Sequence, residues 1–323
     1  MFAYIANTKL TKQKSGISSI NLPALTTALE IQHAIETVAA TTSLYEEKNF
    51  DKRLDAIDLI EFEIIYRLET LLSQSAETDK LIALKHRAEK VKTELEEIDT
   101  NLFQKLQTGL RTGEYTREPL KTMVYKYVDF CECDNTATAG YDTLDVFING
   151  LTHLATIPAQ TKQLEPGMVY YQKTPARIIF ELTAQCDFGN DDIFFDLGSG
   201  LGQAAILVNL LTGVTVKGIE FEPAFCHYAT ACAANLNLTG VTFINTDARA
   251  ADYTKGTVFF MFTPFRGQMM QEVLEMLWKE SLSRKIRIIT YGPCTAQVAL
   301  QSWLSSAAPA DDNVYRLHIF NSL

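Results

Sequence analysis

The stretch Asp191–Pro223, DDIFFDLGSGLGQAAILVNLLTGVTVKGIEFEP, predicts how the C-terminal half of the chain folds. An apolar strand ends at Asp196, a glycine-rich turn follows, and Ala204–Leu211 has the composition of a helix. A second apolar strand, Val214–Ile219, ends at the acid Glu220. In an open α/β sheet, ligands bind beyond the carboxyl ends of the strands, so the turn and this acid should face one site.

The spacing of the glycines indicates which ligand this site takes. Gly198, Gly200 and Gly202 form a GxGxG turn, whereas dinucleotide-binding turns read GxGxxG and face a pyrophosphate. Asp196, just before the turn, suits a cationic ligand, and Glu220 can accept hydrogen bonds from both hydroxyls of a ribose. We therefore expect S-adenosylmethionine, which carries a sulfonium and an ammonium, rather than a nicotinamide cofactor. The alternative is a cofactor-free α/β domain with a glycine turn.

Two motifs in this stretch carry a family resemblance. DLGSGLGQ (196–203) resembles the first motif of the class I S-adenosylmethionine-dependent methyltransferases, and GIEFEP (218–223) resembles their second. The resemblance implies an α/β fold with a Rossmann-like, mostly parallel sheet. Together with the turn and the acids, it implies a set of cofactor-binding residues: Tyr170, Thr174, Asp196, Gly198, Ser199, Gly200, Gln203, Glu220, Asp247 and Ala248.

The segment before this core narrows the resemblance, which covers roughly residues 165–295. VYYQKTP (169–175) followed by DLGSGLGQ resembles the non-SET histone lysine methyltransferases, whose loop reads VYGE before DLGSGVGQ. It is also similar to lysine methyltransferases with YVPT or YVPS before DLGSGDGR, including those acting on a membrane-rotor subunit of ATP synthase. Gln172 stands where the histone enzymes have Glu, and the basic nucleosome-binding tail of those enzymes is absent from this sequence.

Further strands are expected at 241–245, 257–262 and 286–291, with helices between them. Asp247 follows the first of these strands, where the superfamily commonly has an acid that accepts the adenine amino group; the alternative is a helix N-cap. Only Val314–Phe320 then reads as a strand, so the C-terminal antiparallel hairpin should be shortened or completed from elsewhere.

The residues around the transferred methyl group should form an apolar channel. Thr263–Gly267 (TPFRG) ends the fourth strand and lacks the NPPY/F signature of enzymes that methylate bases or glutamine. A lysine acceptor must lose its proton, and an apolar, aromatic wall favours the neutral amine. Candidates for that wall are Tyr171, Phe262, Pro264 and Phe265. We identify no acid–base catalytic residue. The expected activity is methylation of a protein lysine nitrogen; the alternatives are a small-molecule methyltransferase and a non-catalytic cofactor-binding scaffold.

The N-terminal part of the chain predicts an all-α domain. Residues 25–110 contain almost no glycine or proline and read as three helices. The third helix carries a heptad seam, typical of a helical hairpin, a bundle or a dimerising coiled coil: Leu81, Leu84, Ala88, Val91, Leu95, Ile98 and Leu102. We expect a helical domain at 1–120, a joining region at 121–166 and the methyltransferase domain at 167–323. The helical domain is either a structural cap or a module that positions a substrate or binds a partner.

Composition excludes several classes of protein. The net charge is −10 and neither half contains a basic block, which argues against a dedicated nucleic-acid binder. No signal peptide or membrane-length apolar segment is evident, and the six cysteines are scattered, so we expect a cytoplasmic protein with reduced thiols. No metal site is expected, because Cys131 and Cys133 lack a second Cys/His pair at suitable spacing.

Overall fold

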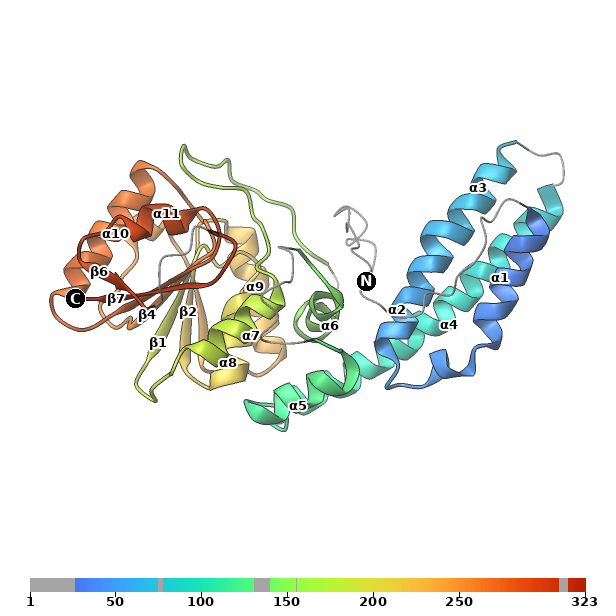
Figure 1. Cartoon of the computed structure of the whole chain (residues 1–323), viewed down its shortest axis with the longest axis horizontal. Helices are drawn as coiled ribbons and strands as arrows, with labels where there is room; N and C mark the ends of the chain where they lie inside the picture. The colour runs from blue at the N-terminus through green and yellow to red at the C-terminus, as the bar shows by residue number, and fades with distance from the viewer. Residues whose placement is uncertain (1–26, 75–77, 131–139, 155, 308–312) are drawn as a thin grey trace. The chain divides into compact units, whose positions relative to one another are not determined.

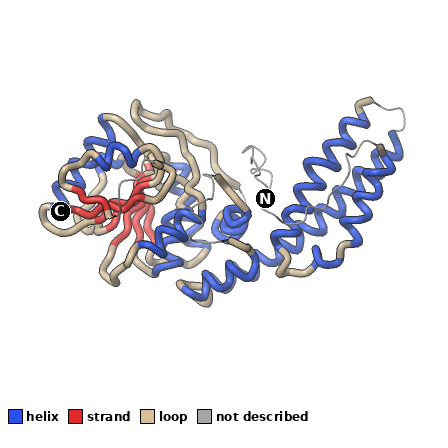
Figure 2. The backbone as a smooth tube through the Cα atoms, viewed as in Figure 1, coloured by secondary structure: helices blue, strands red, loops and turns tan. Residues whose placement is uncertain are grey.

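The computed structural model describes residues 27–74, 78–130, 140–154, 156–307 and 313–323 (Figure 1). The N-terminal stretch and the Cys131/Cys133 pair that the sequence analysis considered lie outside these ranges. The chain divides into two compact units. Among the described residues, the helical unit contains 27–106 and 123–130, and the sheet unit contains 107–122 and the described part of 131–323. Figure 2 shows that the strands all lie in the sheet unit.

The helical unit is an antiparallel arrangement of three long helical stretches, as the sequence predicts. The first stretch is α1 (Ala28–Ala40), which a 3-10 turn at Thr42–Tyr45 follows. The second is continuous and consists of α2 (Phe50–Asp58), a π-helical segment (Leu59–Ile65) and α3 (Tyr66–Leu72). The third is α4 (Thr78–Arg111). Thr27 caps α1 with a capping box to Glu30. Leu81, Ala88, Val91 and Leu95 of the seam are buried against the apolar faces of the other two stretches. The seam therefore packs within the chain, as in a bundle.

One buried ion pair fixes the turn between α1 and α2. Both side chains of Arg53 and Asp99 are fully buried, and their closest N–O distance is 2.6 Å. The Arg53 guanidinium also donates to the carbonyls of Leu44, Glu46 and Glu47 at 3.0, 2.9 and 3.3 Å. Burial raises the pKa of Asp99 to about 6, although Arg53 opposes the shift. Arg53 thus binds three turn carbonyls and Oδ1 of the buried Asp99 carboxylate at once.

The sheet unit is built on seven strands in the order β3-β2-β1-β4-β5-β7-β6. They are β1 (Ile193–Leu197), β2 (Thr215–Glu220), β3 (Val241–Asn245), β4 (Val258–Met261), β5 (Arg287–Thr290), β6 (Leu304–Ser306) and β7 (His318–Ser322). The first five strands are mutually parallel, and β7 runs antiparallel between β5 and β6. This is the Rossmann-like class I methyltransferase sheet that the sequence predicts.

The C-terminal antiparallel hairpin is shortened, which was one of the two alternatives expected from the sequence. The strand expected at Val314–Phe320 begins only at His318, and Leu304–Ser306 pairs with it to complete the hairpin. β6 has three residues and is mostly exposed, so it has no apolar alternation to reveal it. The short helix α11 (Cys294–Ala299), which precedes β6, was not predicted either.

Helices cover both faces of the sheet (Figure 1). α7 (Ala176–Gln185), α8 (Gln203–Thr212) and α9 (Pro223–Asn235) lie on one face, and α10 (Gln268–Ser281) and α11 on the other. The central strand β4 is buried along its whole length, as expected for a strand covered on both sides. Two further helices, α5 (Glu118–Tyr127) and α6 (Thr143–Thr152), precede the sheet. None of the described helices is long and apolar enough to cross a membrane.

We predict that the buried ion pair is essential to the helical unit. Arg53→Met leaves Asp99 buried without its partner and should lower the free energy of unfolding by about 3–5 kcal/mol. Urea unfolding followed by far-UV circular dichroism measures this, with the exposed Arg67→Met as the matched control. The double variant Arg53→Met/Asp99→Leu should recover part of the loss. Equal stability of the Arg53 and Arg67 variants would contradict the prediction.

Candidate functional site

The glycine turn follows β1 and can be built only from glycine at its central positions. Gly198 and Gly200 have φ values of +79° and +52°, which residues with a side chain rarely adopt. A Cβ on Gly198 would lie 2.4 Å from the Pro264 side chain, and a Cβ on Gly200 would lie 2.2 Å from the Tyr171 ring. The turn is tied to the next strand, because the amides of Gly198 and Ser199 both donate to the Ile219 carbonyl at 2.9 and 3.0 Å.

Glu220 is held in a fixed orientation at the end of β2. Its side chain is almost buried, its Oε2 accepts from the Gly200 amide at 2.6 Å, and its Oε1 accepts from the Glu222 amide at 2.7 Å. Each carboxylate oxygen retains a second acceptor position. A carboxylate fixed in this way can accept two hydroxyl groups of one ligand without first being ordered.

The site contains two buried acids, and no cationic side chain in the described part of the chain pairs with them. Asp196 is 4% exposed and Glu220 is 9% exposed, and among the described residues neither forms an ion pair with a lysine or arginine. Burial raises the pKa of Asp196 to about 7, and the charge of Glu220 contributes to the shift. Burial also raises the pKa of Glu220, against the hydrogen bonds from the backbone. A cationic ligand bound beside the two acids would lower the pKa of both and so favour their charged forms.

Polar atoms without partners lie in the same turn. Ser199 Oγ and both amide atoms of Gln203 are buried and have no hydrogen-bond partner among the described residues. Buried polar groups in native proteins are nearly always satisfied, so these atoms mark a place where a polar ligand belongs. The glycine cradle, the two acids and these unpaired atoms fit the amino-acid and ribose parts of S-adenosylmethionine.

The tyrosine segment Met168–Thr174 is joined to the end of β4 by backbone pairing. Met168 and Phe265 form an antiparallel β-bridge. The Val169 amide donates to the Pro264 carbonyl at 3.2 Å, and the Arg266 amide donates to the Gly167 carbonyl at 2.8 Å. This pairing brings the tyrosines that precede the core beside the TPFRG segment, about a hundred residues later in the chain.

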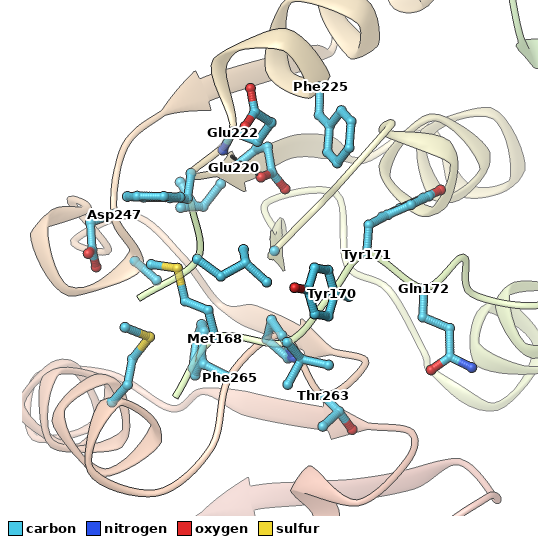
Figure 3. A pocket seen from close by; sticks show the side chains of 18 of the residues that line it. Met168, Tyr170, Tyr171, Gln172, Glu220, Glu222, Phe225, Asp247, Thr263 and Phe265 are labelled. Atoms are coloured by element: carbon cyan, nitrogen blue, oxygen red, sulfur yellow. Dashed lines mark hydrogen bonds between the residues drawn. The ribbon is translucent and has the colours of Figure 1, made fainter. Parts of the chain in front are cut away.

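A pocket lies between these elements (Figure 3). Glu220 and Tyr170 lie on facing sides of it in Figure 3, with Asp247 toward one end and Gln172 toward the other. Its lining includes five of the predicted cofactor-binding residues: Tyr170, Gly198, Glu220, Asp247 and Ala248. All four predicted channel residues line it too: Tyr171, Phe262, Pro264 and Phe265. The other predicted residues do not line it: Thr174, Asp196, Ser199, Gly200 and Gln203.

Asp247 serves as a cap, the alternative role considered from the sequence. Its Oδ1 accepts from the Arg249 amide at 2.7 Å and caps the 3-10 turn Ala248–Ala250. Its Oδ2 pairs with the Arg249 guanidinium at 2.6 Å, which lowers the pKa of Asp247. Arg249 also binds Glu165 at 2.6 Å, so Asp247 is ordered by a network that reaches the segment just before Met168. Contact with adenine remains a prediction for this residue.

Several pocket residues were missed from the sequence. Phe221, Glu222 and Phe225 follow Glu220 closely, Met168 directly precedes the VYYQKTP segment, and Thr263 is the first residue of TPFRG but was not named as a candidate. Glu222 accepts from the amides of Thr161 and Lys162 at 2.9 and 2.7 Å and thereby holds this distant segment beside the pocket. Burial opposes the effect, but these hydrogen bonds lower the pKa of Glu222 to about 2. The sequence EFEP (220–223) could have revealed Glu222, because this second acid follows just after the end of β2 and so also lies at the carboxyl edge of the sheet.

We predict that Gly200→Ala weakens binding of S-adenosylhomocysteine at least tenfold, roughly the effect of one lost buried hydrogen bond. The new methyl group would displace the Tyr171 ring and the amide that holds Glu220. Gly113→Ala is the matched control, because Gly113 has a φ of +78° and no atom within 4 Å of the added Cβ. Calorimetric titration measures both; equal affinities of the two variants would contradict the prediction.

Comparison with known proteins agrees with this geometry. Residues 160–256 match the family model described as histone methylation protein DOT1. None of the curated proteins matches the chain.

Solved structures give low overall similarity. An RNA methyltransferase from Salinibacter ruber bound to S-adenosylhomocysteine is 18% identical, with a TM-score of 0.38, and covers 47% of this chain and 92% of its own. A methyltransferase from Thiobacillus denitrificans in complex with the same ligand is 22% identical, with a TM-score of 0.32, and covers 38% of this chain and 50% of its own. Scores this low carry no argument about function, and the fold rests on the strand order of the chain itself.

The methyltransferase strand order, the glycine turn with its two buried acids and the family match lead to one conclusion. The chain is an S-adenosylmethionine-dependent methyltransferase, and its residues 160–256 are similar to the DOT1 family.

Proposed function

We propose that the sheet unit transfers the methyl group of S-adenosylmethionine to the side-chain nitrogen of a protein lysine. The observation that carries this proposal is the match of residues 160–256, which contain the tyrosine segment and both cofactor motifs, to a family described by histone methylation. The aromatic lining of the pocket supports it. We propose a protein lysine as the class of acceptor and do not propose that the protein is a histone.

Several of the predicted cofactor contacts have support in the geometry. Glu220 would accept hydrogen bonds from the ribose hydroxyls, because two backbone amides already orient it. Asp196, with Gly198, Ser199, Gly200 and Gln203, would hold the methionine end, where buried negative charge and unpaired polar atoms lie. Asp247 and Ala248 would contact the adenine, and Tyr170 and Thr174 would close the site.

Methyl transfer requires little acid–base catalysis from the residues of the chain. When bound, S-adenosylmethionine supplies a methyl group already activated on a sulfonium. The residues of the chain must align the acceptor nitrogen, exclude water and favour the neutral amine. Tyr171, Phe262, Pro264 and Phe265 line the pocket together and would form the apolar wall that does this. Phe262 packs 5.0 Å from the buried Tyr291 ring, centroid to centroid, which fixes its orientation.

We further propose the division into a helical domain at 1–120, a joining region at 121–166 and a methyltransferase domain at 167–323. The helical domain would position a macromolecular acceptor, or bind a partner or a second copy of the chain. The charged outer face of α4 supports a role at the surface, since its lysines and glutamates alternate with the buried seam. A cytoplasmic location is proposed from the four described cysteines, which are free and buried.

Labelling a lysate with radioactive S-adenosylmethionine tests the proposed acceptor. We expect counts to remain with the protein fraction and to appear as methyl-lysine after acid hydrolysis. Blocking lysines in the lysate beforehand by acetylation, which converts each lysine amine to a non-nucleophilic amide, should abolish the signal. Counts that appear only in small molecules would overturn the proposal in favour of a small-molecule methyltransferase, and no transfer despite cofactor binding would favour a scaffold.

We predict that Phe262→Ala lowers the rate of protein labelling by roughly one to two orders of magnitude, because a misplaced acceptor loses alignment. Binding of S-adenosylhomocysteine should change much less, since Phe262 belongs to the acceptor side of the pocket. Trp278→Ala, a half-exposed aromatic on α10 that does not line the pocket, is the control. A Phe262 variant that labels protein at the wild-type rate would contradict the assigned role.

A further inference from the structure

Lys173 has an unusual environment for a lysine. Its side chain is 16% exposed, and it belongs to the tyrosine segment, directly after the pocket residues Tyr171 and Gln172. Its Nζ donates to Asn149 Oδ1 and lies 3.9 Å from Asp145 Oδ1. Asn149 and Asp145 are one turn apart on α6, so the two acceptors face the lysine from the same side of that helix. The ammonium group is therefore held by α6.

Asp145 connects this lysine to two helix termini. Its side chain is 3% exposed. Its Oδ2 accepts from the Asp142 amide at 3.0 Å, which closes the capping box of α6, and its Oδ1 accepts from the Ala176 amide at 2.8 Å, at the start of α7. Tyr141, just before α6, adds a third contact to Lys173, because its hydroxyl donates to the Lys173 carbonyl at 2.6 Å. We call Tyr141, Asp145, Asn149 and Lys173 the α6 clamp.

Stability alone does not explain a buried charge at this position. Burial lowers the pKa of Lys173 to about 8, and burial raises the pKa of Asp145 to about 6. Removing two charges from water costs about as much as their attraction returns, so such pairs are weak evidence for stability and a better indication of specificity.

The position of the α6 clamp indicates which part of the site it holds in place. The tyrosine segment is fixed at its start by the bridge between Met168 and Phe265, and at its end by Lys173. Between these two anchors lie Tyr170, which is 77% exposed, and Tyr171, whose ring packs on Gly200 and 5.5 Å from the Phe225 ring. Without the second anchor, the segment would be attached on one side of the pocket only.

The geometry points to Lys173, with Asn149 and Asp145, as positioning residues that hold Tyr170 and Tyr171 over the methyl-transfer pocket. This inference rests on the proposed function for the role of the tyrosines, but the clamp itself can be tested in the protein without ligand.

Amide hydrogen exchange of the unliganded full chain is the primary test. Lys173→Met keeps the length of the side chain and removes its charge. We expect exchange of the Val169 amide, which donates to Pro264, and of the Ala176 amide, which donates to Asp145, to become roughly ten- to a hundredfold faster, the scale of a lost hydrogen bond to a charged group. Exchange in β1 and β4 should be unchanged. The exposed Lys255→Met is the matched control. Unchanged exchange at Val169 and Ala176, or equal acceleration throughout the sheet, would overturn the inference.

A double-mutant cycle distinguishes positioning from a structural role. Lys173→Met should weaken binding of S-adenosylhomocysteine by about tenfold in the wild-type background, and by much less in a Tyr171→Ala background, because the lysine acts through that ring. An equal loss in both backgrounds would overturn the inference. Wild-type protein that does not bind this ligand would contradict the proposed function, while the exchange experiment would still decide the clamp.

Discussion

The site depends on two carboxyl groups buried side by side at the ends of adjacent strands. β1 and β2 pair in register from Ile193 to Leu197, so Asp196 and Glu220 reach the same edge of the sheet. Neither acid has a cationic partner among the described residues, and burial raises the pKa of both. Burying such a pair lowers the stability of the fold, but it creates a site selective for a ligand with positive charge and hydroxyl groups. S-adenosylmethionine has both.

The surroundings of this pair are assembled from segments far apart in the sequence. Glu222 holds the segment at 161–162, Arg249 joins Asp247 to Glu165, and the β-bridge at Met168 joins the tyrosine segment to Phe265. Each connection uses backbone pairing or a charged hydrogen bond and does not rely on apolar contact alone. The pocket is thereby defined on several sides without loops that need to be ordered by a ligand.

The sequence was informative where local pattern and tertiary structure agree. Strand Val241–Asn245 was predicted with its observed bounds, and the glycine turn was predicted because only glycine fits it. β6 was missed, because a three-residue exposed strand is defined by its partner and not by its own composition. Phe225 and Met168 were missed for a related reason: their place in the pocket depends on how α9 and the tyrosine segment pack, which no local pattern records. Asp247 illustrates a further limit, since the same residue type suits a cap and a ligand contact.

The most direct test of the account is calorimetric titration of the purified chain with S-adenosylhomocysteine, with NADH as the control ligand, on the wild type and on Glu220→Gln. Glu220 loses one acceptor in this variant but keeps its size, and the ribose hydroxyls require both oxygens. The account predicts micromolar binding of S-adenosylhomocysteine to the wild type, no binding of NADH, and a loss of at least tenfold in the variant, roughly that of one charge-assisted hydrogen bond. Folded wild-type protein that binds neither ligand, or a variant that binds as well as the wild type, would contradict it.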